Sequence, residues 1–302
     1  PYFLAHGYEV DYCVSPRAND VLTPEEWRPR IPGLLLAWRS AKFTCVSFTN
    51  YELRQLLFEH PTKWGVERKT MQSLLKLDNS VSMAVLETTH VRQAKKQLCV
   101  ANIHTYGGGE NAKPSVNILQ TQLALHGLRK MMYQHYGMNP KKVELDAPAP
   151  MPLIFAGDFN ARPGSGSHEL LSTGFLNASS SWLANTPVRQ ATNTDLQHHL
   201  QLSSAYGSSP FGEPPYTHYS SAHMNGVLDY LWYTPSSLTV HRLLNTPDMT
   251  DRSDLRLPTL EFPSDHFPIG AEFSFEPSPT VQQHQQLLSR RAHLTPHEKQ
   301  QD

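Results

Sequence analysis

The sequence has few cysteines, almost no net charge and no long apolar run. No apolar stretch approaches the roughly 18 residues that a membrane-spanning helix needs, and no signal peptide is visible, so we expect no membrane partner. The formal net charge is -1, which excludes a strong overall positive field. An enzyme that acts on a polyanion needs only a local basic cleft and a metal ion, so charge alone leaves the partner open.

The cysteines are too few and too scattered for a disulfide framework. Cys13, Cys45 and Cys99 are odd in number and widely spaced, and the last two lie in apolar, strand-like runs where buried thiols are common. This pattern favours a reducing compartment, so we expect a cytoplasmic protein, with the nucleus as an alternative. The sequence starts without methionine and already resembles the middle of a fold, which predicts a chain truncated at its amino terminus.

The length and the hydropathy pattern predict one α/β domain. The 302 residues, 39% of them hydrophobic, are enough for one large core, which we assign to residues 1–276. Residues 277–302 are rich in Pro, Gln, Ser and charge, so we expect a disordered polar tail. Apolar residues near helical spacing predict an amphipathic helix over 116–136. Runs rich in β-branched and aromatic residues predict strands at 43–48, 81–88, 97–105, 152–160, 226–234, 237–244 and 269–276. Two packed sheets flanked by helices would accommodate these elements.

Polar side chains occur where several of these strands end. They are Asn102 and His104 in "VANIHT", Asp158 and Asn160 in "GDFN", Asp229 in "VLDYLWY", and Asp265 and His266 in "SDHFP". Strand ends that meet at one edge of a sheet are common places for catalytic groups. Such a set of oxygen and imidazole donors without thiolates suits Mg²⁺, or Mn²⁺, better than structural zinc. A divalent ion with an aspartate that deprotonates water predicts hydrolysis of a phosphodiester.

Each motif also has a purely structural interpretation. "GDFN" could be a turn in which the two polar side chains satisfy backbone donors, and "SDH" could be a turn or a helix cap. Asn102 and His104 could face solvent at a strand end. Asp229 is harder to explain in this way, because a charge between apolar neighbours is costly unless it is paired. His198 and His199 are adjacent, so they point apart and should not chelate one ion; we interpret both as surface residues.

In this order, the four motifs resemble the endonuclease/exonuclease/phosphatase superfamily, whose fold is a two-sheet α/β sandwich. The segments "GYEVDYCVSPRA", "KLDNSVSMAVLE", "LSSAYG", "PPYTHY" and "LPTLEFPSDHFP" are similar to the deadenylase branch, which includes carbon catabolite repressor type subunits, Angel proteins, nocturnin and 2',5'-phosphodiesterase. "SPRANDVLTPEEW" favours the carbon catabolite repressor type.

The resemblance implies a role for each matched residue. Asp158 would activate the attacking water, and Asn160 would orient the phosphate. His104 would contact a phosphate oxygen, with Asn102 supporting its loop. Asp265 would bind the metal ion, directly or through water. His266 would bind the scissile phosphate while Asp229 keeps its imidazole charged and aligned.

The sequence also departs from the family pattern. The principal metal-binding glutamate of the family belongs to a Gln-Glu pair upstream of the matched region, so it is not among these 302 residues. "IPGLLLAW" replaces an Asp-Gly turn. Where deadenylases place an aromatic residue for base stacking, this chain has His223 and Met224 in "SSAHMNG", a weaker platform for adenine.

Three functions follow from the motifs and the resemblance. We favour a magnesium-dependent 3'-to-5' exoribonuclease that removes poly(A) from mRNA as 5'-AMP, with possible scaffold proteins of a deadenylase complex as partners. The first alternative is an enzyme for another phosphate ester, a 2',5'-oligoadenylate phosphodiesterase or a nocturnin-like nucleotide phosphatase. The second is a catalytically inactive interaction module.

Overall fold

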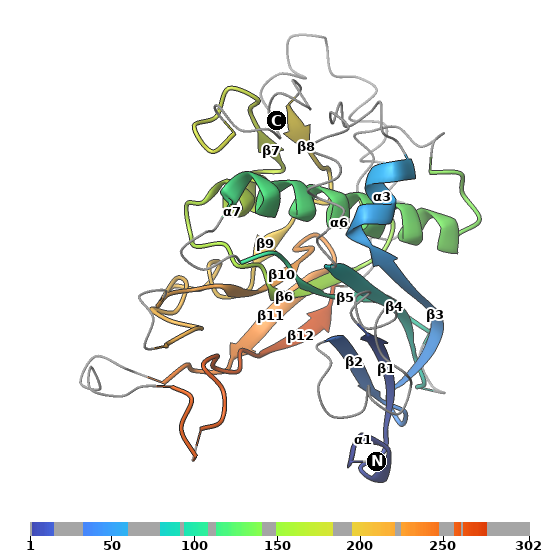
Figure 1. Ribbon diagram of the computed structural model, residues 1–302. Helices are drawn as coiled ribbons and strands as arrows, with labels where there is room; N and C mark the ends of the chain where they lie inside the picture. Colours follow the sequence, from blue (N-terminus) through green and yellow to red (C-terminus); the bar gives the residue numbers. More distant parts are fainter. Residues whose placement is uncertain are drawn as a thin grey trace, which may run out of the picture.

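The computed structural model describes residues 2–14, 33–59, 79–90, 94–107, 113–140, 149–183, 195–220, 225–247, 257–260 and 262–276. A central β-sheet of six strands carries helices on one face and two small sheets on the other (Figure 1). Its strand order is β3-β4-β5-β6-β10-β9, with bounds Phe43–Glu52, Ser80–Thr88, Gln97–His104, Leu153–Asp158, Asp229–Tyr233 and Ser203–Ser204. β5 and β6 are parallel, and the other neighbouring pairs in this sheet are antiparallel.

Helices pack on one face of the central sheet. They are α3 (Leu53–Glu59), α6 (Pro114–His135) and α7 (Gly166–Thr173), and the short helix α1 (Tyr2–Ala5) lies apart from them beside β1 (Figure 1). Their apolar side chains form one large core with the inward-facing residues of the sheet, including Val81, Ile103 and Phe155. The short strands β7 (Phe175–Leu176) and β8 (Leu196–Gln197) pair beside α7 on this side.

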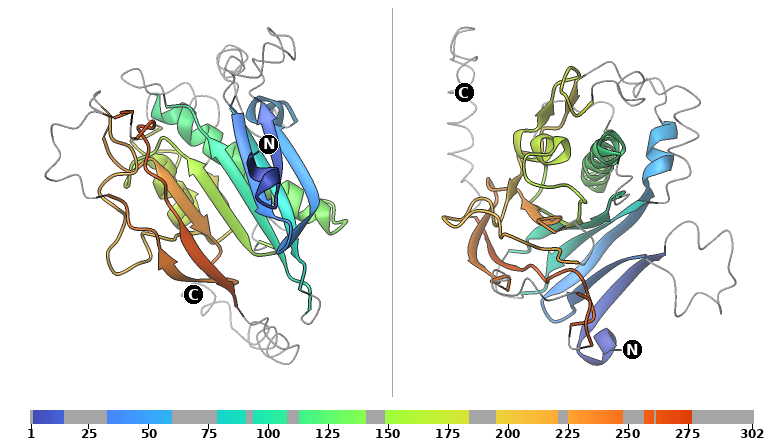
Figure 2. Two further views of the ribbon diagram at one scale, coloured as in Figure 1. Left: turned by 90° about the horizontal axis from the view of Figure 1, so that it is seen from below. Right: turned by 60° about the vertical axis from the view of Figure 1, so that its left-hand side comes forward.

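Two separate two-stranded sheets cover the opposite face, as the right-hand view of Figure 2 shows. β1 (Tyr8–Val14) pairs with β2 (Gly33–Arg39), and Leu36 and Trp38 of β2 pack on Ala84 and Leu86 of β4. β11 (Leu238–Leu243) pairs with β12 (Ala271–Phe275) and packs over β5, β6 and β10. Because layers cover both faces of the central sheet, β4 is buried on both faces over Ser80–Leu86.

The α/β sandwich predicted from the sequence is confirmed, with differences in detail. Each predicted strand and the helix are present with slightly shifted ends, whereas the strands at 8–14 and 33–39, helices α3 and α7 and the short strands are additions. The predicted tail, 277–302, lies outside the described residues. Within the described part of the chain, no helix is both long and apolar enough to cross a membrane.

The helix at 114–135 is not amphipathic, which corrects the prediction. Its polar residues Asn117, Gln120, Thr121 and Gln122 are buried along with its apolar ones. Other segments cover this side of the helix: Asn117 bonds to Ser167 of α7, and the Gln122 amide donates to the Gln197 carbonyl at 3.0 Å. A polar side chain on a helix therefore does not mark a solvent-facing side here, because hydrogen bonds satisfy it in the interior.

His198 is also buried, whereas the sequence placed it on the surface. Its Nε2 donates to the Leu170 carbonyl at 2.8 Å, and its Nδ1 accepts from the Leu200 N–H at 3.3 Å. His199 is half-buried. The difference in burial between the two histidines agrees with the expectation that adjacent side chains point in different directions.

Candidate active site

Three of the predicted residues lie in one row across neighbouring strands. His104 at the end of β5 is the register partner of Asp158 at the end of β6, and Asp158 is the register partner of Asp229 at the start of β10. Directly paired residues present their side chains to the same face of a sheet. By the alternation along each strand, this face is opposite to α6, because Phe155 and Ile103 point into the helix-side core. The strand pairing therefore places one imidazole and two carboxylates side by side at one rim.

Asp158 is the centre of this row. Its Oδ2 lies 3.4 Å from His104 Nε2 and 3.9 Å from His266 Nε2, and its Oδ1 accepts the backbone N–H of Asn160 at 2.8 Å. Burial raises the pKa of Asp158, and the nearby Asp229 carboxylate raises it further, although both imidazoles oppose this. A carboxyl group with a raised pKa is a better base for a water proton than an ordinary aspartate.

Asp229 and His266 form a close pair. His266 Nδ1 donates to Asp229 Oδ2 at 2.8 Å, and this hydrogen bond raises the pKa of His266 more than burial lowers it. The side chains are 17% and 31% exposed, so solvent screens the pair only partly. Thr217 accepts the backbone N–H of Asp229 at 3.0 Å through its Oγ1, which fixes the start of β10. The pair therefore favours the protonated form of the imidazole and directs its Nε2 to the side of Asp158.

A second imidazole and carboxylate lie beside this pair. His218 Nε2 is 3.3 Å from Asp265 Oδ2, and the ring of His218 lies 4.7 Å from that of His266 at 60°. An isolated antiparallel bridge between His218 and His266 joins their segments. Sequence reasoning missed His218, although "PPYTHY" was one of the segments that carried the resemblance. Asp265 is 45% exposed on its side chain, so it faces solvent more than Asp158 or Asp229.

Both predicted asparagines form hydrogen bonds to backbone carbonyls instead of pointing freely to solvent. Asn160 has a left-handed φ of 45°, and its Nδ2 donates to the Thr105 carbonyl at 3.0 Å. The turn interpretation of "GDFN" thus describes part of its geometry, together with its place at the rim. Asn102 donates from Nδ2 to the Leu35 carbonyl at 3.1 Å, which ties β5 to β2.

Buried amides of α6 fix the loops that carry the site. Asn117 Nδ2 donates to the Phe159 carbonyl at 2.7 Å and to Thr105 Oγ1 at 2.8 Å. Gln120 Oε1 accepts the Tyr106 N–H at 2.7 Å. The network makes the 104–106 and 158–160 segments rigid, which pre-organises a reaction centre. Sequence reasoning missed both amides. The signal available in the sequence was the presence of these polar residues within the predicted helix.

Most of the predicted residues therefore meet, whereas Asn102 bonds to β2 instead. Two groups could hold a cation, Asp158 with Asp229 and His266, and His218 with Asp265 and His266; within each group the ligand atoms lie within 4.8 Å of one another. His266 belongs to both groups, so the three carboxylates surround one imidazole. His223 and Met224 lie outside the described residues.

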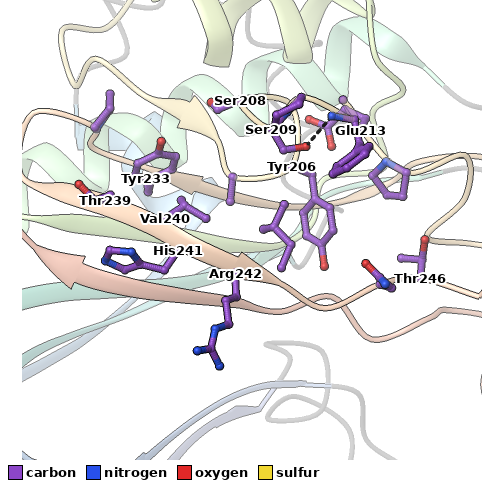
Figure 3. Close-up of a pocket in the computed structure, with 18 of the residues that line it drawn as sticks. Tyr206, Ser208, Ser209, Glu213, Tyr233, Thr239, Val240, His241, Arg242 and Thr246 are labelled. Atoms are coloured by element: carbon purple, nitrogen blue, oxygen red, sulfur yellow. Dashed lines mark hydrogen bonds between the residues drawn. The ribbon is translucent and has the colours of Figure 1, made fainter.

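Two cavities differ in their relation to this rim. A cavity of about 200 Å³ is lined by Asn160 and its neighbours. A larger one of about 780 Å³ lies between the 205–215 segment and β11, with Tyr206, Arg242 and Thr246 in its wall (Figure 3). No residue of the candidate active site lines the larger cavity.

The geometry agrees with a family match. The family described as "Endonuclease/Exonuclease/phosphatase family" matches residues 132–266, a range that ends at His266 and includes Asp158 and Asp229. The matched part of the chain is thus similar to this family. Enzymes of this family are nucleases and phosphatases, which is the class of chemistry that the rim indicates.

The chain is also similar to individual curated proteins. The chain is 27% identical over 289 residues to the CCR4-Not complex 3'-5'-exoribonuclease subunit Ccr4 of Mycosarcoma maydis, which covers 92% of this chain and 42% of that protein. It is 25% identical over 251 residues to 2',5'-phosphodiesterase 12 of Bos taurus, covering 81% and 38%. The chain thus spans less than half the length of these two relatives.

Solved structures agree on the fold. ANGEL2, a 2',3'-cyclic phosphatase, in complex with adenosine-2',3'-vanadate, matches with a TM-score of 0.63 and 21% identity over 90% of this chain and 76% of that chain. The human Nocturnin catalytic domain matches with a TM-score of 0.55 and 22% identity over 91% and 75%.

Proposed function

We propose that this chain carries the catalytic site of a magnesium-dependent 3'-to-5' exoribonuclease that shortens poly(A) and releases 5'-AMP. The observation that carries the proposal is the row of His104, Asp158 and Asp229 with His266 beside it, in a chain similar to Ccr4 exoribonuclease subunits. We further propose mRNA poly(A) shortening in the cytoplasm as its setting and scaffold proteins of a deadenylase complex as its partners.

We propose for the side chains the roles that the resemblance implies, which their placement supports. Asp158 accepts the proton of the attacking water, and Asn160 orients the terminal phosphate. His104 and His266 donate to the phosphate oxygens, and Asp229 keeps His266 protonated through the 2.8 Å hydrogen bond. The new bond joins the water oxygen to phosphorus. The P–O3' bond breaks, the leaving O3' oxygen takes a proton from solvent water, and the shortened RNA leaves with a 3'-hydroxyl.

The donor set fits a divalent cation. Burial and the neighbouring Asp229 both disfavour the charge of Asp158, and a cation at the rim would relieve this repulsion. Asp158 and Asp265 would hold the ion, with the upstream glutamate that the resemblance implies as a further ligand. When bound, magnesium would supply polarisation of the phosphoryl oxygen and stabilisation of the leaving oxygen. The carboxylate oxygens of Asp158 and Asp265 are hard ligands of the kind that Mg²⁺ prefers.

The alternative phosphate esters share this rim and differ in the pocket around it. The similarity to 2',5'-phosphodiesterase 12 gives a specific reason to keep the 2',5'-linked oligoadenylate in view. A nocturnin-like nucleotide phosphatase would use the same groups on a dinucleotide. An inactive interaction module would keep the fold and bind RNA or partners without turnover.

The test is hydrolysis by the full-length protein. We expect poly(A) labelled at its 5' end to shorten stepwise with magnesium, to stay intact with a chelator, and to release 5'-AMP. Poly(U), 2',5'-linked oligoadenylate and NADPH are the comparison substrates. Faster turnover of the 2',5' linkage or of NADPH would replace the proposed substrate, and no metal-dependent turnover of any of them would favour the interaction module.

A further inference from the structure

The cavity of about 200 Å³ shares Asn160 with the candidate active site. Asn160 contacts Asp158 Oδ1 through its backbone N–H and lies on Gly107, where an added Cβ would collide with its Oδ1. The cavity is smaller than the roughly 300–1,000 Å³ that enclose whole drug-sized ligands, so it suits one planar ring rather than a complete nucleotide. Ile118 and Leu228 give it an apolar floor.

Trp182 lines this cavity and is partly open to solvent. It is 36% exposed, whereas Trp38 and Trp232, the other tryptophans that the structure describes, are 6% and 1% exposed and belong to hydrophobic cores. Gly166 lets the ring approach, because a Cβ at that position would lie 3.0 Å from Trp182 Cγ. The Trp182 side chain therefore packs close to the backbone at the start of α7, while the residue stays partly exposed to solvent.

Two cations line the same cavity. Arg162 and Lys113 are exposed, and neither forms an ion pair with any residue in the part of the chain that the structure describes. The side chain of Arg162 runs beside Gly226, three residues before Asp229. Among the described residues that line the cavity, none is acidic. An aromatic ring beside cationic side chains is an arrangement that binds single-stranded nucleic acid.

We propose that this cavity binds a nucleobase of single-stranded RNA next to the scissile phosphate, with Trp182 stacking on the base and Arg162 binding a neighbouring phosphate. The inference rests on the proposed exoribonuclease function for its substrate, and it adds a recognition site to the one that the sequence assigns to His223 and Met224. Stacking tolerates every base, so this subsite contributes affinity and positioning rather than preference for adenine.

The decisive experiment measures binding without turnover. Full-length protein carrying Asp158→Asn is titrated into a 5'-fluorescein oligoadenylate with magnesium, and anisotropy gives the affinity. Trp182→Ala should weaken binding roughly 5- to 140-fold, the range that corresponds to loss of one base–aromatic stack. Trp182→Phe should keep most of the affinity. Phe211→Ala is the matched control, because Phe211 is 94% exposed and lines the larger cavity.

Salt dependence tests the cation. Arg162→Gln should reduce the slope of log affinity against log salt by roughly 0.7, the value for one phosphate contact on a single strand. Arg242→Gln, an 82% exposed arginine side chain remote from the rim, should leave the slope unchanged.

A fluorescence measurement guards against misfolding of Trp182→Ala. Oligoadenylate should quench tryptophan emission in the Asp158→Asn protein, and Trp182→Phe should remove most of that quenching. Equal affinity of Trp182→Ala and Phe211→Ala, persistence of the quenching in Trp182→Phe, or no binding of oligoadenylate would overturn the subsite. Trp182-dependent binding by a wild-type protein that hydrolyses no RNA would reject the exoribonuclease and leave the subsite in place.

Discussion

His266 and His198 are the same side chain in two regions with opposite electrostatics. His266 lies at the rim of the central sheet among carboxylates, and its hydrogen bond to Asp229 raises its pKa. His198 lies in the 195–200 segment and contacts α7, and burial there lowers its pKa to about 4. The first environment favours the cationic imidazole, which can face a phosphate, whereas at neutral pH the second histidine is neutral and packs against backbone groups.

The difference lies in how each region treats charge. The helix side contains polar groups only where hydrogen bonds satisfy their neutral forms, as for His198 and Asn117. The rim instead holds Asp158 near Asp229, although both burial and that neighbour disfavour its charge. Ionisable groups whose charged form is disfavoured by their surroundings are typical of functional sites.

The largest effect should follow from Asp158→Asn. Removing the base should lower turnover of oligoadenylate by roughly 10²- to 10⁴-fold. Because the pKa of Asp158 is raised in the folded state, ionising it costs stability as pH rises above its ordinary value of 3.8. With a chelator at neutral pH, the variant should therefore melt at a higher temperature than the wild type.

The control for this variant is Asp195→Asn. Asp195 is exposed and accepts the Ala178 N–H, a bond that asparagine can keep, so both turnover and melting temperature should stay near wild type. Unchanged turnover in Asp158→Asn would remove Asp158 from the mechanism.

The next effect concerns the His266–Asp229 pair. We expect His266→Ala and Asp229→Asn each to lower turnover by roughly 10²-fold, and the double variant to lose little more than the worse single one, because the two side chains act as a unit. Rates of the four proteins at saturating substrate give the coupling. If the losses multiply instead, the residues act independently.

The smallest effect is on stability and concerns His198. Its folded pKa of about 4 lies below its ordinary 6.5, so the unfolded chain binds more protons between these values and stability falls as pH decreases through that window. The loss should reach about 3 kcal/mol. His198→Gln, whose amide can still donate to the Leu170 carbonyl, should remove most of this dependence in denaturant titrations at pH 7, 5.5 and 4.

His199→Gln serves as its matched control and should keep the wild-type pH dependence. His266 contributes in the opposite sense: its raised pKa stabilises the fold most below 6.5, and this contribution is lost as pH rises through its folded value. A His198→Gln protein that loses as much stability in acid as the wild type would contradict the neutral, buried state.

The sequence predicted the strands and the rim residues because local signals carry them. "PLIFAGDFN" changes from an apolar strand to a polar turn within a few residues, and Asp158 lies at that change. The alignment of His104, Asp158 and Asp229 could not be derived locally, because it depends on the register between strands that are far apart in the chain. The family resemblance supplied that convergence instead.

Residues that act through tertiary contacts escaped the prediction. Asn117 and Gln120 look like solvent-facing helix positions until α7 and the 104–106 loop cover them. His198 looks like a surface residue in the sequence because the Leu170 carbonyl that accepts its hydrogen bond is 28 positions away. His218 had a motif but no role, since its proximity to Asp265 and His266 arises from an isolated bridge.

The most direct test of the shared rim is a crystal structure of the full-length protein with Mn²⁺ and AMP, using anomalous scattering to locate the metal. We expect the anomalous peak beside the carboxylates of Asp158 and Asp265, with the phosphate of AMP within hydrogen-bonding reach of His104 and His266. A manganese peak bound away from these carboxylates, or AMP bound elsewhere while the rim stays empty, would contradict the account.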